Sequence, residues 1–352
     1  MNESALSDLP DLPSVADAAP LQDIARAFVA SHDEPVTPVS SLLSMLPFSY
    51  LRSFYVALLE TGLVRLHSFN ELQFPPDADL STEEGLKTTY AEEFKTWAKT
   101  ARASEEPRKL DLFLLHDCDS APLETQYMLG LEGELGMRST TSVFVRERDG
   151  RGNLRNYGID YDVLKRLQDD KGLSFSYHCN AAEVALYDEE LVRTTFNDDI
   201  EFLHSKGLDI RCFSPHGGVA GPGGLNNYSY FYPAFSRRLL YWTHNKYAPS
   251  GRRYSDGGMH ARLPRNDASL DIRAFFKTLL EARAPGAVMR CFMLIHPQYY
   301  FAKDAELATP HLATNAWLAE FWDLHRQGRE SEYWAPVRAA LESSFGSEQA
   351  RG

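Results

Sequence analysis

The chain has 352 residues, of which 43% are hydrophobic and 24% are charged, so it can bury the core of one large domain or two ordinary ones. Its 36 Lys and Arg against 49 Asp and Glu give a formal net charge of -13. Nucleic acids and anionic membrane surfaces need a positive field, so neither is expected as a partner. No apolar run approaches the roughly 20 residues that span a bilayer.

The N-terminal part of the chain divides into an arm and a helical region. Residues 1–20 are acidic, rich in proline and without periodicity, which predicts a disordered arm. They carry neither the basic nor the apolar segment of a secretory signal, so the expected location is cytoplasmic. Residues 21–108 are expected to form a helical region packed on a larger domain. Helical spacing there covers residues 21–32, 49–59 and 85–102.

From residue 109 to residue 343, short apolar runs alternate with helical stretches, before an expected flexible tail at 344–352. This alternation predicts an α/β fold, with a parallel sheet covered by helices. The expected strands cover residues 110–119, 139–145, 173–179, 208–213 and 287–296. The expected helices cover residues 122–135, 159–168, 188–206 and 270–284.

Acidic and imidazole side chains stand at the ends of four of these expected strands. Asp117 and Asp119 close one strand, His178 and His296 close two others, and His216 follows a fourth. Sites in parallel α/β folds lie beyond the carboxyl ends of the strands. We therefore expect these side chains to converge.

Asp117 and Asp119 are two residues apart, so on an extended strand both point to the same face. Two carboxylates on one face repel each other unless a cation or a shared proton lies between them. A strand end facing water, or capping the next helix, is the ordinary alternative. The histidines at other strand ends favour a metal ion instead, held by Asp119, His178 and His216 with positions open for water.

Two further features of these strand ends bear on substrate and acid–base chemistry. His216 precedes Gly217 and Gly218, a tight turn where the backbone can approach a substrate closely. His296 lies near Tyr299, and a histidine held there is a candidate general acid or a residue that fills a polar gap in packing.

Each of the four cysteines lies within five residues of the polar groups just named, but no C-x2-C pair is present. We therefore expect small buried side chains behind the site, in a reducing compartment. These cysteines are Cys118, Cys179, Cys212 and Cys291.

Five short motifs resemble those of the NodB-like polysaccharide deacetylase superfamily, which comprises carbohydrate esterase family 4 and its relatives. They are LLHDCDS, SYHCNAAE, FSPHGG, YSDGG and MLIHPQYY, in that order, and the resemblance covers roughly residues 110–301. It implies a distorted (β/α) barrel of about seven strands, here with an added N-terminal helical region. It also implies Asp117 as the catalytic base, Asp119 and His178 as metal ligands, His296 as the general acid and Asp256 as the residue that orients it.

The chain departs from the family pattern at two positions. The family usually has a second histidine four residues after the first, where this chain has Ala182, and its third-motif arginine, which orients the base, is Ser214 here. His216 is the first candidate for the lost ligand and Glu183 a weaker one, while Arg211 is a candidate for the lost charge. A divergent subgroup associated with surface-glycan biosynthesis is similar in its SPHGG and IHP motifs, which indicates a coherent variant.

The resemblance implies a metal-dependent hydrolase that removes an N- or O-acetyl group from a sugar or glycan precursor. The divalent ion is most simply Zn²⁺. Ser214, Gly217, Gly218 and Tyr299 are the expected substrate-binding residues. Trp242 and Tyr300 are either further stacking surfaces for sugar rings or ordinary core aromatics.

Two other functions stay open on the sequence. A non-catalytic glycan-binding barrel is supported by Ala182 and Ser214, whereas Asp117, Asp119 and His296 weigh against it because binding alone needs neither a base nor an acid. A metal-dependent amidohydrolase acting on a non-sugar acyl amide differs from the first function only in its substrate.

Overall fold

The computed structural model describes residues 46–103, 110–119, 121–149, 151–218, 220–238, 240–243, 247–256 and 289–301, with residues 275, 324, 327–329, 332 and 335. The expected arm at 1–20, the helix at 21–32 and the tail at 344–352 lie outside the described residues. The helix expected at 270–284 also lies outside them, apart from residue 275, which is helical.

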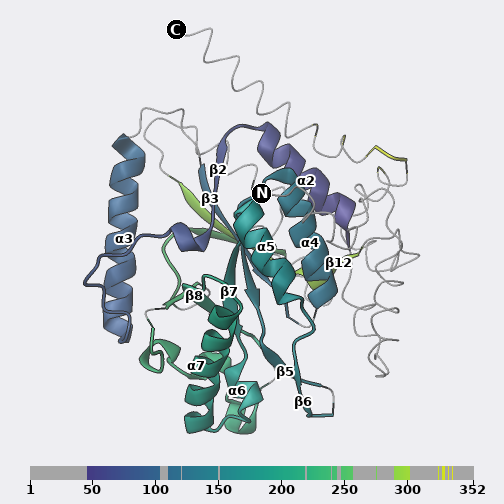
Figure 1. Ribbon diagram of the computed structural model, residues 1–352. Coiled ribbons are helices and arrows are strands. Elements are labelled where there is room, and N and C mark those ends of the chain that lie inside the picture. The colour runs from purple at the N-terminus through teal and green to yellow at the C-terminus, as the bar shows by residue number, and fades with distance from the viewer. Residues whose placement is uncertain are drawn as a thin grey trace.

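The described elements follow the expected alternation of strands and helices (Figure 1). The helices are α2 (Phe48–Glu60), α3 (Glu83–Ala103), α4 (Pro122–Leu135), α5 (Tyr161–Lys171), α6 (Ala181–Val184) and α7 (Glu189–Ser205). The strands are β1 (Leu46–Pro47), β2 (Val64–His67), β3 (Leu110–Asp117), β4 (Thr140–Val143), β5 (Arg146–Arg148), β6 (Leu154–Asn156), β7 (Ser174–Cys179), β8 (Cys212–Pro215), β9 (Tyr241–Trp242), β10 (Arg252–Ser255), β11 (Arg290–Ile295) and β12 (Tyr300–Phe301).

Helix ends follow local chemistry, as α5 illustrates. The Asp160 carboxylate accepts hydrogen bonds from the backbone N–H groups of Asp162 and Val163, which have no partner inside the helix. The helix ends at Gly172, whose φ of 70° is in the left-handed region that glycine adopts without a steric penalty.

Seven parallel strands form a curled sheet in the order β10-β11-β3-β4-β7-β8-β9. The α/β class and a barrel-like parallel sheet are therefore confirmed. Over the described residues the sheet is a half-barrel, because no pairing of β9 with β10 closes it.

Strand β2 joins this sheet from the N-terminal region, which was expected to be helical. It pairs with the first half of β3, through Leu110 to Phe113, on the edge where β4 pairs with the second half. The sequence of β2, VRLH, alternates apolar and polar residues as a strand does, but this signal covers only four residues beside stretches with helical spacing.

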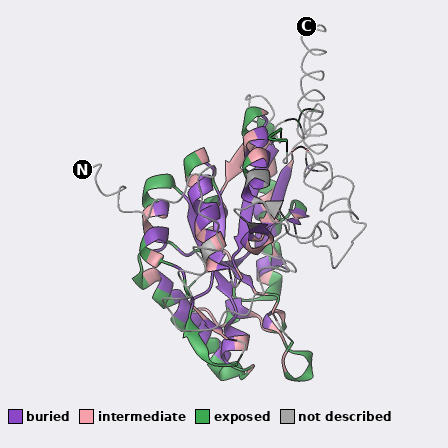
Figure 2. Cartoon of the chain, turned by 90° about the vertical axis from the view of Figure 1, so that its right-hand side faces the viewer, coloured by how far each residue is buried: buried purple, intermediate pink, exposed green. Residues whose placement is uncertain are grey.

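The two faces of β3 contact different groups of helices, and the strand is buried over its whole length. Figure 2 shows that the inner elements are buried whereas the helices have exposed outer sides. Leu112 and Leu114 belong to the core that includes residues of α2 and α4, while Phe113 and Leu115 belong to the core that includes residues of α3. Asp117 is on the same face as Phe113 and Leu115, because side chains two apart on a strand share a face.

Helix α3 is attached to the sheet by a buried ion pair. Arg290 at the start of β11 donates two hydrogen bonds to Glu93, at 2.6 and 2.9 Å, and the arginine side chain is fully buried. The guanidinium also lies over the rings of Trp97 and Phe94, at 4.9 and 5.1 Å from their centroids. A buried charge left without its partner is costly, so the pair makes the position of α3 on the sheet specific.

None of the helices among the described residues is both long and apolar enough to cross a bilayer.

We predict that Glu93→Gln lowers the free energy of unfolding by about 3 kcal/mol, because it leaves the Arg290 charge buried without a counter-ion. Urea unfolding followed by circular dichroism measures the change. Glu92→Gln, an exposed neighbour on the same helix, is the control and should stay within about 0.5 kcal/mol of the original chain. Equal effects of the two substitutions would contradict the role of the pair.

Candidate metal centre

The candidate site lies at the carboxyl edge of the sheet, where neighbouring strands contribute one or two side chains each. The register pairs Ile295 with His116, which places His296 beside Asp117. It also pairs His178 on β7 with Ser214 on β8, beyond β4. The expected convergence is therefore observed, because parallel strands in register present their ends at one edge.

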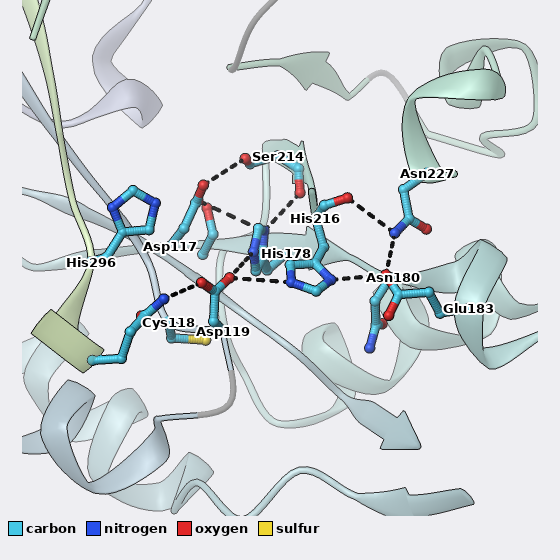
Figure 3. A network of polar contacts seen from close by, with 12 residues as sticks. Asp117, Cys118, Asp119, His178, Asn180, Glu183, Ser214, His216, Asn227 and His296 are labelled. Carbon is cyan, nitrogen blue, oxygen red and sulfur yellow. Dashed lines mark hydrogen bonds and ion pairs between the residues drawn. The ribbon is translucent and has the colours of Figure 1, made fainter. Parts of the chain in front are cut away.

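Asp119, His178 and His216 form a group that could hold a metal ion (Figure 3). One ligand atom from each lies within 4.8 Å of the others. Asp119 Oδ1 is 3.0 Å from His178 Nε2 and 3.4 Å from His216 Nε2. The three residues proposed from the sequence are thus brought together.

The other nitrogen of each imidazole faces an acceptor. His178 Nδ1 is 3.0 Å from the carbonyl oxygen of Ser214, and His216 Nδ1 is 2.9 Å from Glu183 Oε1. A carbonyl or a carboxylate oxygen only accepts, so in the neutral rings both protons are on Nδ1. Both Nε2 lone pairs then point toward the Asp119 carboxylate, an arrangement that a cation stabilises.

Asp119 is held in the form that binds a cation. Burial raises the pKa of its carboxyl, but in the metal-free state with protonated rings the hydrogen bond from His178 Nε2 and the histidine charges outweigh burial and lower the pKa well below its usual range. Gln298 donates a hydrogen bond to Oδ2, which leaves Oδ1 facing the histidines. The backbone has a φ of 37°, in the left-handed region that aspartate tolerates better than most residues.

Phe144 forms an aromatic wall behind both histidine ligands. Its ring stacks on His178 at 4.9 Å between centroids and meets His216 edge-on at 5.1 Å. It is buried and directly follows β4, at the same edge of the sheet. The sequence did not single out Phe144, although its place at the end of an expected strand was a usable signal.

Asp117 lies beside the group, and only one of its two carboxylate oxygens accepts a hydrogen bond from the described residues. Ser214 Oγ donates to Oδ2 at 3.5 Å, and Oδ1 is 3.7 Å from His178 Nδ1, which itself bonds to a carbonyl. Within the described part of the chain, Oδ1 is buried and accepts no hydrogen bond. A buried carboxylate oxygen of this kind is costly unless a further donor binds it.

His296 is paired with Asp256, as the family resemblance implies. Nδ1 is 2.6 Å from Asp256 Oδ1, and the backbone N–H of His296 donates to Oδ2 at 2.8 Å. Burial lowers the pKa of the imidazole, but the charge and hydrogen bond of Asp256 outweigh burial and raise the pKa to about 9. Tyr300 also donates to Asp256 Oδ2 at 3.3 Å.

The remaining candidate residues have mixed outcomes. Ser214 is fully buried, where it contacts Asp117 and His178 rather than an open surface. Tyr299 lies against His296, with 5.0 Å between ring centroids. Gly217 is exposed in the loop after β8. Arg211 does not supply the missing charge, because it precedes β8 at the opposite edge of the sheet and pairs with Asp209.

The aromatic and cysteine side chains near the site lie in the core. Trp242 and Tyr300 are 1% and 0% exposed, which confirms the alternative of core packing over sugar stacking. All four cysteines are buried, as expected, and none of them forms a disulfide bond.

Comparison of the chain with protein-family models gives no match, and comparison with curated proteins gives none either. The geometry of the site and the five motifs are therefore what supports a function.

We predict that the purified chain binds one equivalent of a divalent ion and that His178→Ala and His216→Ala each abolish this binding, because each removes one of three converging ligand atoms. Elemental analysis after dialysis against Zn²⁺ measures the stoichiometry. His204→Ala, at the end of α7, is the control and should bind as the original chain does. Retention of a full equivalent in either ligand variant would show that the ion is held elsewhere.

Proposed function

We propose that this chain is a metal-dependent hydrolase of the NodB-like type that removes an acetyl group from a sugar or glycan precursor. The observation that carries the proposal is the three-residue group of Asp119, His178 and His216 with an acid–base pair beside it, Asp117 and His296. A binding protein needs no such pair.

Zn²⁺ is the simplest ion for this ligand set. Two imidazole nitrogens and one carboxylate oxygen are its usual protein ligands, and three protein ligands leave positions for water and substrate. When bound, a divalent ion polarises the acyl carbonyl and lowers the pKa of water.

Asp117 is the proposed general base. Its Oδ1 accepts no hydrogen bond from the described residues, so it is available to take a proton from the attacking water. Ser214 holds Oδ2 in place of the family's arginine, as a neutral hydroxyl rather than a charge. Water oxygen then forms a bond to the acyl carbon as its proton moves to Asp117.

His296 is the proposed general acid. Asp256 fixes its Nδ1, so Nε2 carries the proton that can be donated. When the bond between the acyl carbon and the sugar nitrogen breaks, this proton moves to the amine, and the products are acetate and the free amino sugar. For an O-acetyl substrate the same proton moves to the sugar oxygen.

We predict that the metal-loaded chain releases acetate from N-acetylated amino sugars and that Asp117→Asn lowers kcat/KM by about 100-fold or more, because the amide cannot take the proton from water. The variant should still bind one equivalent of metal, since Asp117 is not in the ligand group. Asp170→Asn, an exposed aspartate on α5, is the control.

The same assay separates the two alternative functions. Acetate release from simple acetamides but not from sugars would indicate an amidohydrolase with a non-sugar substrate. A metal-loaded chain that binds acetylated sugars and leaves them intact would indicate a glycan-binding barrel.

We predict that kcat/KM falls on the basic side with a midpoint no higher than about pH 9, and that Asp256→Asn moves this midpoint to lower pH. The raised pKa of His296 keeps the imidazole protonated, and hence active as an acid, until the pH passes that pKa. Removing the Asp256 charge leaves burial to lower the pKa. A pH profile of the variant whose basic limb is unmoved would show that His296 is not the group that titrates.

A further inference from the structure

Glu183 on α6 contacts the metal centre without belonging to its ligand group. Its Oε1 is 2.9 Å from His216 Nδ1, the imidazole nitrogen on the far side from Asp119. The group of converging ligand atoms contains Asp119, His178 and His216 but not Glu183. Figure 3 shows Glu183 beyond His216, on the side away from Asp119.

Asn227 holds the Glu183 carboxylate in place beside His216. Its side-chain Nδ2 donates to Glu183 Oε1 at 2.7 Å and to the carbonyl oxygen of His216 at 3.1 Å. Its Oδ1 accepts from the backbone N–H of Ala182 at 3.0 Å. Asn227 is 1% exposed, so this one buried amide connects α6 to the loop that carries His216.

The Glu183 side chain packs closely against Gly218, where a larger residue would clash with it. A Cβ built on Gly218 would lie 1.8 Å from Glu183 Oε1, so any other residue at position 218 would displace the carboxylate. Arg148 on β5 donates to the backbone carbonyl oxygens of Glu183 and Val184, which fixes the position of α6. The close approach of Glu183 is therefore one structural reason for glycine at position 218.

We propose that Glu183 is a positioning residue that keeps the proton of His216 on Nδ1 and so presents the Nε2 lone pair to the metal ion. Carboxylates that accept from the outer nitrogen of a ligating histidine fix its tautomer and its orientation. His216 lies in a loop and therefore needs such support more than His178, which lies within β7. The inference rests on the proposed function for the identity of the metal ligands.

The test is the affinity for Zn²⁺, measured by competition with a chromophoric chelator. We expect Glu183→Ala to bind Zn²⁺ about 10- to 100-fold more weakly than the original chain. Glu183→Gln keeps the shape of the side chain and one acceptor oxygen. Its Zn²⁺ affinity should therefore fall less than that of Glu183→Ala. Glu190→Gln, an exposed change on the neighbouring α7, is the matched control and should leave the affinity unchanged.

The tautomer of His216 provides a second readout that needs neither metal nor activity. In the metal-free chain labelled with ¹⁵N-histidine, nuclear magnetic resonance should show the neutral His216 ring with its proton on Nδ1, and a mixture of tautomers in Glu183→Ala. An unchanged tautomer together with an unchanged Zn²⁺ affinity would overturn the proposal. A chain that shows both expected effects but releases no acetate would leave Glu183 as a positioning residue and remove the proposed deacetylase.

Discussion

The site depends on the convergence of three electron-rich atoms at the edge of a parallel sheet. Asp119 Oδ1 and the Nε2 atoms of His178 and His216 face one another because each ligand has its other polar atom committed to the protein. Without a cation, or protons on both rings, these atoms repel. The contacts around them therefore have one physical role, which is to hold that unfavourable arrangement ready for an ion.

Strand β11 connects this centre to the anchoring of α3. Arg290 begins the strand in its buried pair with Glu93, and His296 follows its last residue beside Asp117. One end of the strand thus anchors a helix and the other carries a candidate site residue, in keeping with the usual division between the two edges of parallel α/β sheets. Because β11 pairs with β3 over six positions, the spacing of His296 and Asp117 is set by backbone hydrogen bonds rather than by loops.

The parts that could be predicted from the sequence are those with a local signal. Buried apolar runs ending in acids or imidazoles located β3, β7 and β11, and the rule that sites form at carboxyl edges placed Asp119, His178 and His216 together. Strand β2 was missed because its apolar–polar alternation covers only four residues beside stretches with helical spacing. Arg211 was expected inside a strand at 208–213, whereas β8 begins at Cys212, so Arg211 lies at the amino edge of the sheet, away from the site. Contacts set by loops, such as Gln298 on Asp119, have no spacing from which they can be deduced.

Under the proposed function, the two departures from the NodB-like pattern form one rearrangement. With alanine at position 182, the second imidazole comes from the loop after β8, and position 182 instead offers its backbone N–H to Asn227. Asn227 in turn holds Glu183 and the backbone of His216, so the peptide segment that lacks the histidine supports its replacement. Serine at position 214 fits the same rearrangement, because its carbonyl oxygen accepts from His178 Nδ1 while its hydroxyl contacts Asp117, the proposed base. These contacts support the proposed function, because a decayed site would be expected to lose them, although no described residue supplies the charge of the family's arginine.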